Sequence, residues 1–306
     1  SWISYGLGTE NQNLPAFVTI SPSSSKGGPR NYSNAFLPSI HQGTALGRAG
    51  NVNGAKIRNV ENAMLSDSQR KKRFNLLQSL NTYQSFACAN DDELEADIKN
   101  YELAWRMQTE APELTDLSNE SKATKQIYGI NEKYTDDFGK QCLLARRMVE
   151  RGVRFVCVNY SDESANPRWD QHGNMPKHAD HAKATDKPVA GLLKDLKSRG
   201  LLDDTLVWWG GEFGRTPFSQ NNNGRDHNPR GFTVFLAGGG IKSGFSYGST
   251  DEVGGIAVDN RVHMHDLHAT ILYALGLDHE NLTYRYSGRN FRLTDVHGKV
   301  IKELFT

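Results

Sequence analysis

Acidic residues and histidines gather in two polar stretches in the second half of the chain. The first stretch contains Asp170 and His172, and the second contains Glu212, Asp226 and His227. Carboxylates and neutral imidazoles together suit a divalent metal such as Zn²⁺, Mn²⁺ or Fe. A metal held in this way can polarise a phosphoryl or sulfuryl oxygen, or ionise a bound water. The two stretches therefore predict a metal site whose chemistry acts on oxyanions.

Four further residues complete this hypothesis. Arg215 and Arg225 carry guanidinium groups, whose fork geometry suits tetrahedral oxyanions. We take Arg215 as a catalytic candidate that steadies anionic oxygens, and Arg225 as a substrate-binding candidate. Asn174 is a second substrate-binding candidate. His265 is a second catalytic candidate, which could donate a proton or orient a ligand.

These assignments have structural alternatives. Glu212 could form an ion pair with nearby Arg215 instead of binding a metal. Asp226 and His227 could belong to a turn, because the run NNNGRDHNP is rich in turn-forming residues. Other histidines stand at expected helix starts, where we favour solvated or structural roles for His178, His181 and at least one of His263, His265 and His268.

The composition limits the classes of protein to consider. The chain has 306 residues, a net charge of +1, 23% charged and 37% hydrophobic residues. These values are typical of a globular protein without a strong attraction to nucleic acid or to membranes. No apolar run approaches the ~20 residues of a membrane span. Three widely spaced cysteines, Cys88, Cys142 and Cys157, argue against a disulfide framework, and we expect the last two in the core.

Strand-like and helical patterns alternate in the second half of the chain. Residues 1–60 predict a short strand at 16–20 within a long loop, which we interpret as a surface wrap rather than a substrate-side lid. Residues 61–150 are mainly helical, with helices expected at 66–81, 91–108 and 135–151. Strands at 153–160, 205–209 and 231–240 alternate with helices at 181–199 and 265–275. The pattern predicts an α/β fold with a central, mostly parallel sheet flanked by helices, and both polar stretches at carboxyl ends of strands.

Several long motifs carry a family resemblance. The runs WDQHGN, GGEFGRTP, GRDHNP and HMHDLHATILYALGLDHENLTYRYSGRNFRLTDVHG resemble domain-of-unknown-function family 1501. That family is similar to sulfatases and belongs with the alkaline-phosphatase-like fold. The resemblance implies a single alkaline-phosphatase-like α/β domain over residues 1–306, with a metal site at the strand ends.

The resemblance also implies roles for particular residues. Asp170, His172 and His227 match ligands of the first metal of the superfamily. Glu212 stands where the superfamily has the aspartate of an Asp-His pair, and Phe213 replaces the histidine of that pair. A second metal would therefore lose one ligand, for which the carboxylate at position 226 could compensate.

The opening segment of the superfamily has no counterpart in this sequence. Superfamily members begin with a strand that ends in a metal-binding aspartate, followed by a nucleophile at a helix N-terminus. We expect the domain to lack this first strand, or the family to dispense with the nucleophile. The resemblance further suggests a periplasmic or extracellular location, although no signal peptide is visible at Ser1.

The resulting functional hypothesis is a metal-dependent hydrolase of phosphate or sulfate esters. Zinc is the favoured ion, with manganese, iron and calcium as alternatives, and the expected substrate is a small-molecule or glycan ester. A non-catalytic protein that binds a ligand or glycan on the same fold is the alternative from another class. A mutase or phosphotransferase would share the fold but needs a phosphate-carrying group that the sequence does not show. The oligomeric state stays open.

Overall fold

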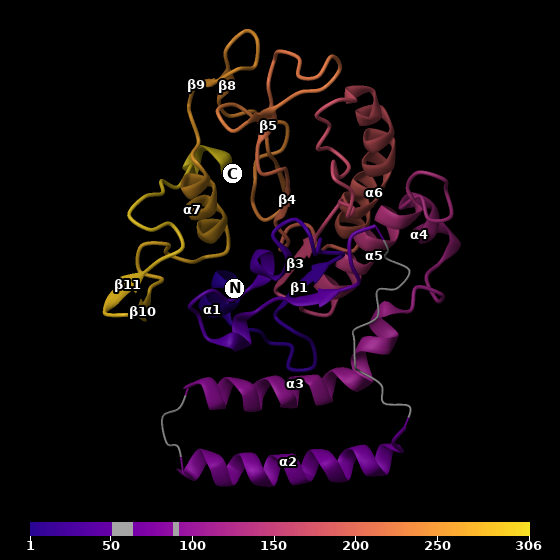
Figure 1. Ribbon diagram of the computed structural model, residues 1–306, viewed down its shortest axis with the longest axis vertical. Coiled ribbons are helices and arrows are strands. Elements are labelled where there is room, and N and C mark those ends of the chain that lie inside the picture. The colour runs from indigo at the N-terminus through magenta and orange to yellow at the C-terminus, as the bar shows by residue number, and fades with distance from the viewer. Residues whose placement is uncertain (51–63, 88–91) are drawn as a thin grey trace. The chain divides into compact units, whose positions relative to one another are not determined.

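The computed structural model describes residues 1–50, 64–87 and 92–306 (Figure 1). The chain forms two compact units, each made of two chain segments. Unit 1 comprises Ser1–Lys122 and Lys140–Glu163, and unit 2 comprises Ala123–Gly139 and Ser164–Thr306. Cys88 and part of the loop expected before residue 60 lie outside the described residues.

Unit 1 is built on a three-stranded parallel sheet. Its strand order is β2 (Thr44–Leu46), β1 (Phe17–Ile20), β3 (Phe155–Val158), with both neighbours of β1 parallel to it. All four residues of β1 are buried, as expected for the central strand of a covered sheet. The strands predicted at 16–20 and 153–160 are thus confirmed. The core on this sheet consists of Leu14, Val18, Ile20, Leu46, Leu114, Leu144, Ala145, Met148 and Val153.

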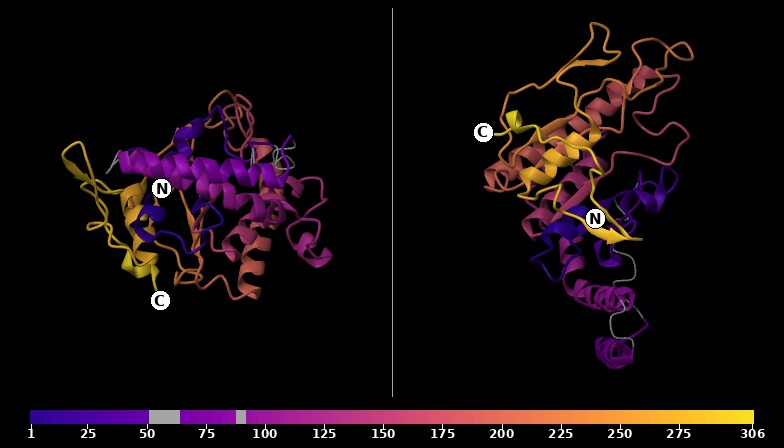
Figure 2. Two further views of the ribbon diagram at one scale, coloured as in Figure 1. Left: turned by 90° about the horizontal axis from the view of Figure 1, so that it is seen from below. Right: turned by 90° about the vertical axis from the view of Figure 1, so that its left-hand side faces the viewer.

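Two long helices of unit 1, α2 (Asp67–Ala87) and α3 (Asp92–Thr115), lie side by side as an antiparallel pair (Figures 1 and 2). Ser66 caps α2 as the sequence predicts. Its hydroxyl accepts a hydrogen bond from the Gln69 backbone N–H at 3.3 Å, and Gln69 Oε1 accepts one from the Ser66 backbone N–H at 2.9 Å. Phe74 of α2 stacks on Trp105 of α3 with ring centroids 4.7 Å apart. The other described helical elements that lie wholly within unit 1 are α1 (Trp2–Leu7), η1 (Gly28–Tyr32) and η2 (Ser39–His41).

Helix α5 (Asp136–Glu150) belongs to both units. Its part in unit 1 carries Cys142, whose thiol pKa is raised by complete burial, in agreement with the predicted core position. Cys157 is half-buried on β3, and burial raises the pKa of its thiol as well. Arg146 and Arg147 of α5 both bind the carboxylate of Glu120, at 2.8 and 2.6 Å. The helix is therefore held to unit 1 by apolar packing and by a largely buried ion-pair cluster.

Unit 2 contains short antiparallel strand pairs in place of the mostly parallel sheet that we expected. The pairs are β4 (Val207–Trp209) with β7 (Phe235–Ala237), β5 (Gly214–Arg215) with β6 (His227–Asn228), β8 (Ser249–Thr250) with β9 (Ala257–Asp259), and β10 (Tyr284–Tyr286) with β11 (Arg289–Phe291). The stretch between β4 and β7 holds no helix, and a parallel pair would need a crossover connection, usually helical. Within the described residues, the parallel part of the fold is the sheet of unit 1.

The two longest helices of unit 2 agree with the predicted spans 181–199 and 265–275 to within three residues. They are α6 (His178–Ser198) and α7 (Met264–Ala274), with the short elements α4 (Lys122–Ile127), η3 (Met175–Lys177) and η4 (Lys302–Leu304). Tyr128 is fully buried, and its hydroxyl donates to Asp195 Oδ2 of α6 at 3.0 Å. Arg199 Nε donates to the other oxygen of Asp195 at 2.7 Å. None of the described helices has the length and apolar composition needed to span a bilayer.

Candidate metal centre

Two loops of unit 2 are held together by backbone contacts. The Arg225 N–H donates to the Gln171 carbonyl at 3.2 Å, and the Met175 N–H donates to the Asn223 carbonyl at 2.8 Å. A Cβ atom on Gly224 would lie 1.9 Å from the carbonyl oxygen of His172, so only glycine permits this approach. The contacts align the segment that carries Asp170 and His172 with the segment that leads into β6.

The β5–β6 hairpin then positions two side chains opposite each other. Arg215 of β5 pairs with His227 of β6 in the antiparallel register. The Thr216 N–H donates to the Asp226 carbonyl at 3.0 Å and continues the pairing beyond the strands. Directly opposite residues in an antiparallel pair project from the same face. The guanidinium of Arg215 and the imidazole of His227 therefore lie on the same face of the hairpin.

Asp170, His172 and His227 form a cluster of three potential ligand atoms, all within 4.8 Å of one another. His172 Nε2 lies 2.9 Å from Asp170 Oδ1, and His227 Nε2 lies 3.0 Å from the same oxygen. The two Nε2 atoms are 3.1 Å apart. Ligands about 2.0–2.1 Å from a tetrahedral zinc ion are separated by about 3.3 Å. The three atoms therefore fit one such ion with small adjustments.

A neighbouring side chain sets the orientation of His172. Gln220 Oε1 lies 2.7 Å from His172 Nδ1. An amide oxygen can only accept a hydrogen bond, so the proton belongs on Nδ1 and the lone pair on Nε2. This is the arrangement found in metal-binding histidines, where an outer partner orients the ring and raises its basicity. Sequence reasoning missed Gln220, because a single glutamine in a turn-rich loop carries no motif.

Phe213 packs against the other imidazole. Its ring lies 4.0 Å from that of His227, with the planes inclined by 30°. The guanidinium carbon of Arg215 lies 5.9 Å from the centroid of the same phenyl ring. Phe213 thus forms an apolar wall beside the candidate ligand His227.

Arg215 binds the central carboxylate of the cluster. Its Nη2 donates to Asp170 Oδ1 at 2.7 Å. Partial burial alone would raise the pKa of Asp170, but the hydrogen bonds from Arg215 and His227 outweigh it, so this pKa lies below its usual value. The carboxylate is therefore kept ionised, which is the form that binds a cation.

The remaining predicted site residues lie outside this cluster. Glu212 is exposed and does not join the three ligand atoms, and Arg215 binds Asp170 instead of forming the ion pair considered with Glu212. Asp226 Oδ1 accepts the His227 backbone N–H at 2.8 Å, as in the turn alternative, while the side chain of His227 still reaches the cluster. Three of the five predicted ligands are thus brought together.

The predicted substrate-binding and proton-donating residues are also separate from the three ligands. Arg225 Nη1 donates to the Gly224 carbonyl at 2.8 Å, and Asn174 is exposed at the start of η3. His265 lies near the start of α7, where its ring stacks on His263.

The pair His178 and His181 supports the first loop. His178 Nε2 lies 3.0 Å from the Trp169 carbonyl oxygen, and both imidazoles contact the Trp169 ring. Both histidines are half-buried, so they pack more closely than the solvated helix start that we expected. They anchor the residue next to Asp170 and thereby position the loop.

The geometry defines a mixed helix-and-strand protein with a candidate Asp-His-His metal centre. The chain matches the family of proteins of unknown function DUF1501 over residues 1–305, and it belongs to that family. No curated protein and no solved structure matches this sequence.

Proposed function

We propose that Asp170, His172 and His227 bind one divalent metal, with zinc favoured, and that the protein is a metal-dependent hydrolase of phosphate or sulfate esters. The observation that supports this proposal is the convergence of two imidazole nitrogens on one carboxylate oxygen from segments 55 positions apart. Three protein ligands leave a fourth position open on a tetrahedral ion. That number is typical of catalytic zinc sites, whereas structural sites are closed by four ligands.

The residues around the cluster have complementary tasks in this proposal. When bound, the metal would supply Lewis acidity toward an ester oxygen and a bound water ionised near neutral pH. Asp170 contributes the negative charge that retains the ion, and Gln220 keeps Nε2 of His172 available. Arg215 stands beside the carboxylate, where its guanidinium can steady the anionic oxygens of a substrate. The ligands are half-buried or exposed, so an ester can approach from solvent.

A non-catalytic binding protein is the second candidate function. It is favoured by the position of Glu212 and Asp226 outside the cluster. In the part of the chain that the structure describes, Asp170, His172 and His227 are the single group that could hold a metal ion. One ion without a second metal or an adjacent nucleophile is compatible with ligand binding that is not followed by turnover.

Metal content provides the first test. We expect near-stoichiometric metal in the purified protein by inductively coupled plasma mass spectrometry, and its loss in Asp170→Ala and His227→Ala. Glu212→Ala is the matched control, because its carboxylate is exposed and does not join the three ligand atoms. Absence of metal after incubation with zinc, manganese, iron or calcium would exclude the proposed site.

Activity provides the second test. The metal-loaded protein is assayed with aryl phosphates and aryl sulfates, with and without a chelator. Turnover that disappears on chelation and in Asp170→Ala supports the hydrolase. Stoichiometric metal without turnover of either ester class would contradict the hydrolase and favour the binding protein.

A further inference from the structure

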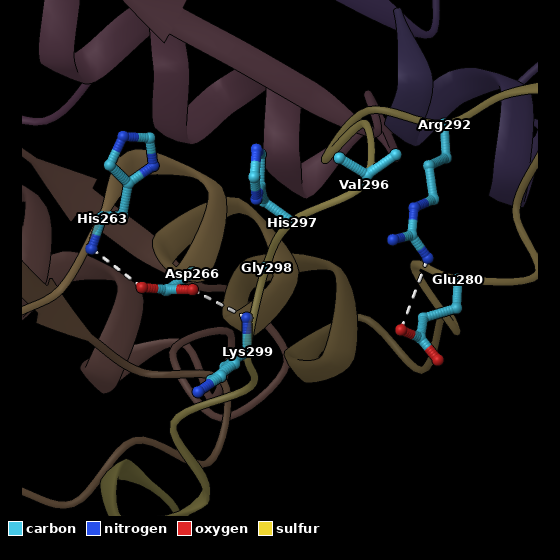
Figure 3. A pocket seen from close by; sticks show the side chains of 8 residues that line it. All are labelled: His263, Asp266, Glu280, Arg292, Val296, His297, Gly298 and Lys299. Atoms are coloured by element: carbon cyan, nitrogen blue, oxygen red, sulfur yellow. Dashed lines mark hydrogen bonds and ion pairs between the residues drawn. The ribbon is translucent and has the colours of Figure 1, made fainter.

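The polar pocket beside the start of α7 in unit 2 is balanced by groups of its own lining (Figure 3). Asp266 accepts the His263 backbone N–H at 2.9 Å and the Lys299 backbone N–H at 2.8 Å. Glu280 lies 3.4 Å from the guanidinium of Arg292. Both carboxylates of this pocket therefore have partners within the chain. The outer face of α2 in unit 1 is different, because it exposes apolar side chains.

Helix α2 has one face against α3 and one face turned away from it. On the first face, Phe74 stacks on Trp105, and the Arg70 guanidinium donates to Gln108 Oε1 at 3.1 Å. These contacts place the start of α2 beside the end of α3, and the end of α2 beside the start of α3 (Figure 1). Helix α3 lies between α2 and the sheet of unit 1, so the second face of α2 is the outer one (Figures 1 and 2).

Three large apolar side chains form a stripe on this outer face. Leu76, Leu80 and Tyr83 are four and three residues apart, so they lie on one side of the helix. That side is about 180–240° around the helix from Phe74, and thus away from α3. The three residues are 62%, 54% and 76% exposed. Single exposed apolar residues are normal on a surface, whereas a stripe with this spacing is typical of a contact between helices.

The face of α2 toward α3 contains several polar side chains. Three side-chain nitrogen atoms on this face, Arg70 Nε, Gln78 Nε2 and Asn81 Nδ2, are buried without a hydrogen-bond partner among the described residues. A helix with a single neighbour usually turns its apolar residues toward that neighbour and its amides toward water. Here two amides face α3 while two leucines face outward. The sequence of α2 therefore suits a helix that is covered on both faces.

The two ends of the α2–α3 pair carry opposite charge. Residues 70–73 of α2 have the sequence RKKR, and residues 92–97 of α3 have the sequence DELEAD. Asp67 and Lys99 each form an ion pair with one residue of these runs, so most of the charge of each run stays uncompensated. The basic run lies at the start of α2, and the acidic run lies beside its end. A partner that fits this surface must therefore present acids and bases in the opposite order.

We propose that the stripe of Leu76, Leu80 and Tyr83 binds the same stripe of a second copy of this chain, with the two α2 helices antiparallel. A two-fold axis near Leu80 makes the contact self-complementary, as in most homodimers. The axis brings the basic run of each copy toward the acidic run of the other, whereas a parallel pair would bring like charges together. A second copy thus supplies both the apolar stripe and the charge pattern. The inference does not depend on the metal centre or on hydrolase activity.

The test is the mass of the protein in solution, measured by sedimentation equilibrium over a series of concentrations. One helix pair buries less than the roughly 1,600 Å² of a standard interface, so we expect reversible association. The average mass should rise from the chain mass of 34.1 kDa toward twice that value. Leu80→Glu should weaken association about 30-fold or more, because it places a carboxylate at the centre of the apolar contact. Asn75→Glu adds the same charge at an exposed position outside the stripe and is the matched control.

A charge variant tests the antiparallel arrangement. Lys72→Glu combined with Arg73→Glu removes the net charge of the basic run. We expect this variant to associate more weakly than the parent protein at low salt, and to respond less to added salt, because the screened attraction has been removed. A parallel pair predicts the opposite result, since like charges that repel each other would be lost.

Three results would overturn the proposal, with folding of each variant verified by circular dichroism. A parent protein that stays monomeric at every concentration would leave the stripe to a different partner. Equal association of Leu80→Glu and Asn75→Glu would assign the dimer to another face. Tighter association of the Lys72→Glu, Arg73→Glu variant would exclude the antiparallel arrangement.

Discussion

Gln220 orients His172 within the candidate metal centre, so that the Nε2 atom of the imidazole faces Asp170. Its amide oxygen accepts the Nδ1 proton at 2.7 Å, and the opposite nitrogen faces Asp170. Outer partners of metal-binding histidines typically change metal affinity about 10- to 100-fold. At the residue scale, the cluster therefore extends beyond its three ligands.

This dependence predicts the effect of changing Gln220. We expect Gln220→Ala to weaken zinc affinity about 10- to 100-fold, because the His172 ring loses the acceptor that orients it. Gln220→Glu keeps an acceptor oxygen at the same place and should retain affinity. Competition with a chromophoric chelator measures both variants. Equal affinity in the parent protein and Gln220→Ala would contradict the role of Gln220 in orienting His172 for metal binding.

A second residue-scale prediction concerns Glu163 in unit 1. Its exposed carboxylate accepts the Ser24 N–H at 2.8 Å, the Ser25 N–H at 3.1 Å and the Ser23 hydroxyl at 3.2 Å. The backbone N–H of Ser24, with the other donors, lowers the pKa of Glu163 from its ordinary 4.5 to about 2. A carboxyl group with a lowered pKa stabilises the folded state above its unfolded pKa and loses this contribution as pH falls.

We therefore expect Glu163→Gln to lower the thermal midpoint at pH 6–7, with a difference from the parent protein that disappears between about pH 4.5 and 2. Glu10→Gln, which changes another exposed carboxylate of unit 1, serves as the control and should show little effect at any pH. Thermal melts followed by circular dichroism provide the measurement. A difference that persists unchanged at pH 2–3 would contradict the role assigned to the Glu163 carboxylate.

At the scale of elements, two helical glycines in unit 2 allow close contact with the carbonyl groups of residues 127 and 128, at the end of α4. A Cβ atom on Gly191 of α6 would lie 2.5 Å from the Ile127 carbonyl oxygen, and one on Gly139 of α5 would lie 2.2 Å from the Tyr128 carbonyl oxygen. Both contacts are with backbone, which cannot rotate away as a side chain can. The close approach lets the Tyr128 hydroxyl reach Asp195 on the buried face of α6.

This packing reverses the usual effect of a glycine substitution. Alanine normally stabilises a helix interior by about 1 kcal/mol relative to glycine. We expect Gly191→Ala to destabilise the protein by about 1–3 kcal/mol, because the added methyl group forces α6 away from the turn. Lys194→Ala, on the exposed face of the same helix, should stay within about 0.5 kcal/mol of the parent protein. Urea denaturation gives both values, and a stabilised Gly191→Ala would contradict the close contact.

The elements also show which parts of the structure the sequence could predict. Apolar spacing and capping residues are local signals, so the positions of α2, α3, α5, α6 and α7 follow from them, although α2 and α3 continue to Ala87 and Thr115, beyond the predicted ends at 81 and 108. Strand pairing depends on residues far apart in the chain, so the antiparallel pairing of β4 with β7 could not be predicted from either run. The ligand types were visible in Asp170, His172 and His227. The sequence did not reveal that Glu212 lies outside the cluster, because its position depends on where the β5–β6 hairpin begins.

At the scale of the whole molecule, all three candidate ligands belong to unit 2. A ligand stabilises the state that binds it, by about 2.7 kcal/mol at a concentration 100 times its Kd. The parallel sheet of unit 1 contributes no ligand to this cluster. Metal binding should therefore stabilise unit 2 more than unit 1.

We expect zinc to slow hydrogen exchange mainly in residues 169–175 and 214–228, with a smaller change in β1, β2 and β3. Hydrogen-exchange mass spectrometry with and without zinc provides the measurement, and Asp170→Ala should remove the effect. Equal protection of both units by zinc would show that they open as one cooperative structure, contrary to this prediction.

The shared use of α5 bears on how the protein is synthesised. The chain passes between the units after residues 122, 139 and 163, so neither unit is a continuous segment. A ribosome delivers β1 and β2 early, but β3 becomes available only after residue 158 has been added. Until then, one edge of β1 has no partner strand, and unpaired edges invite association between chains. Nascent chains released before β3 is complete are therefore the products that most need protection from aggregation.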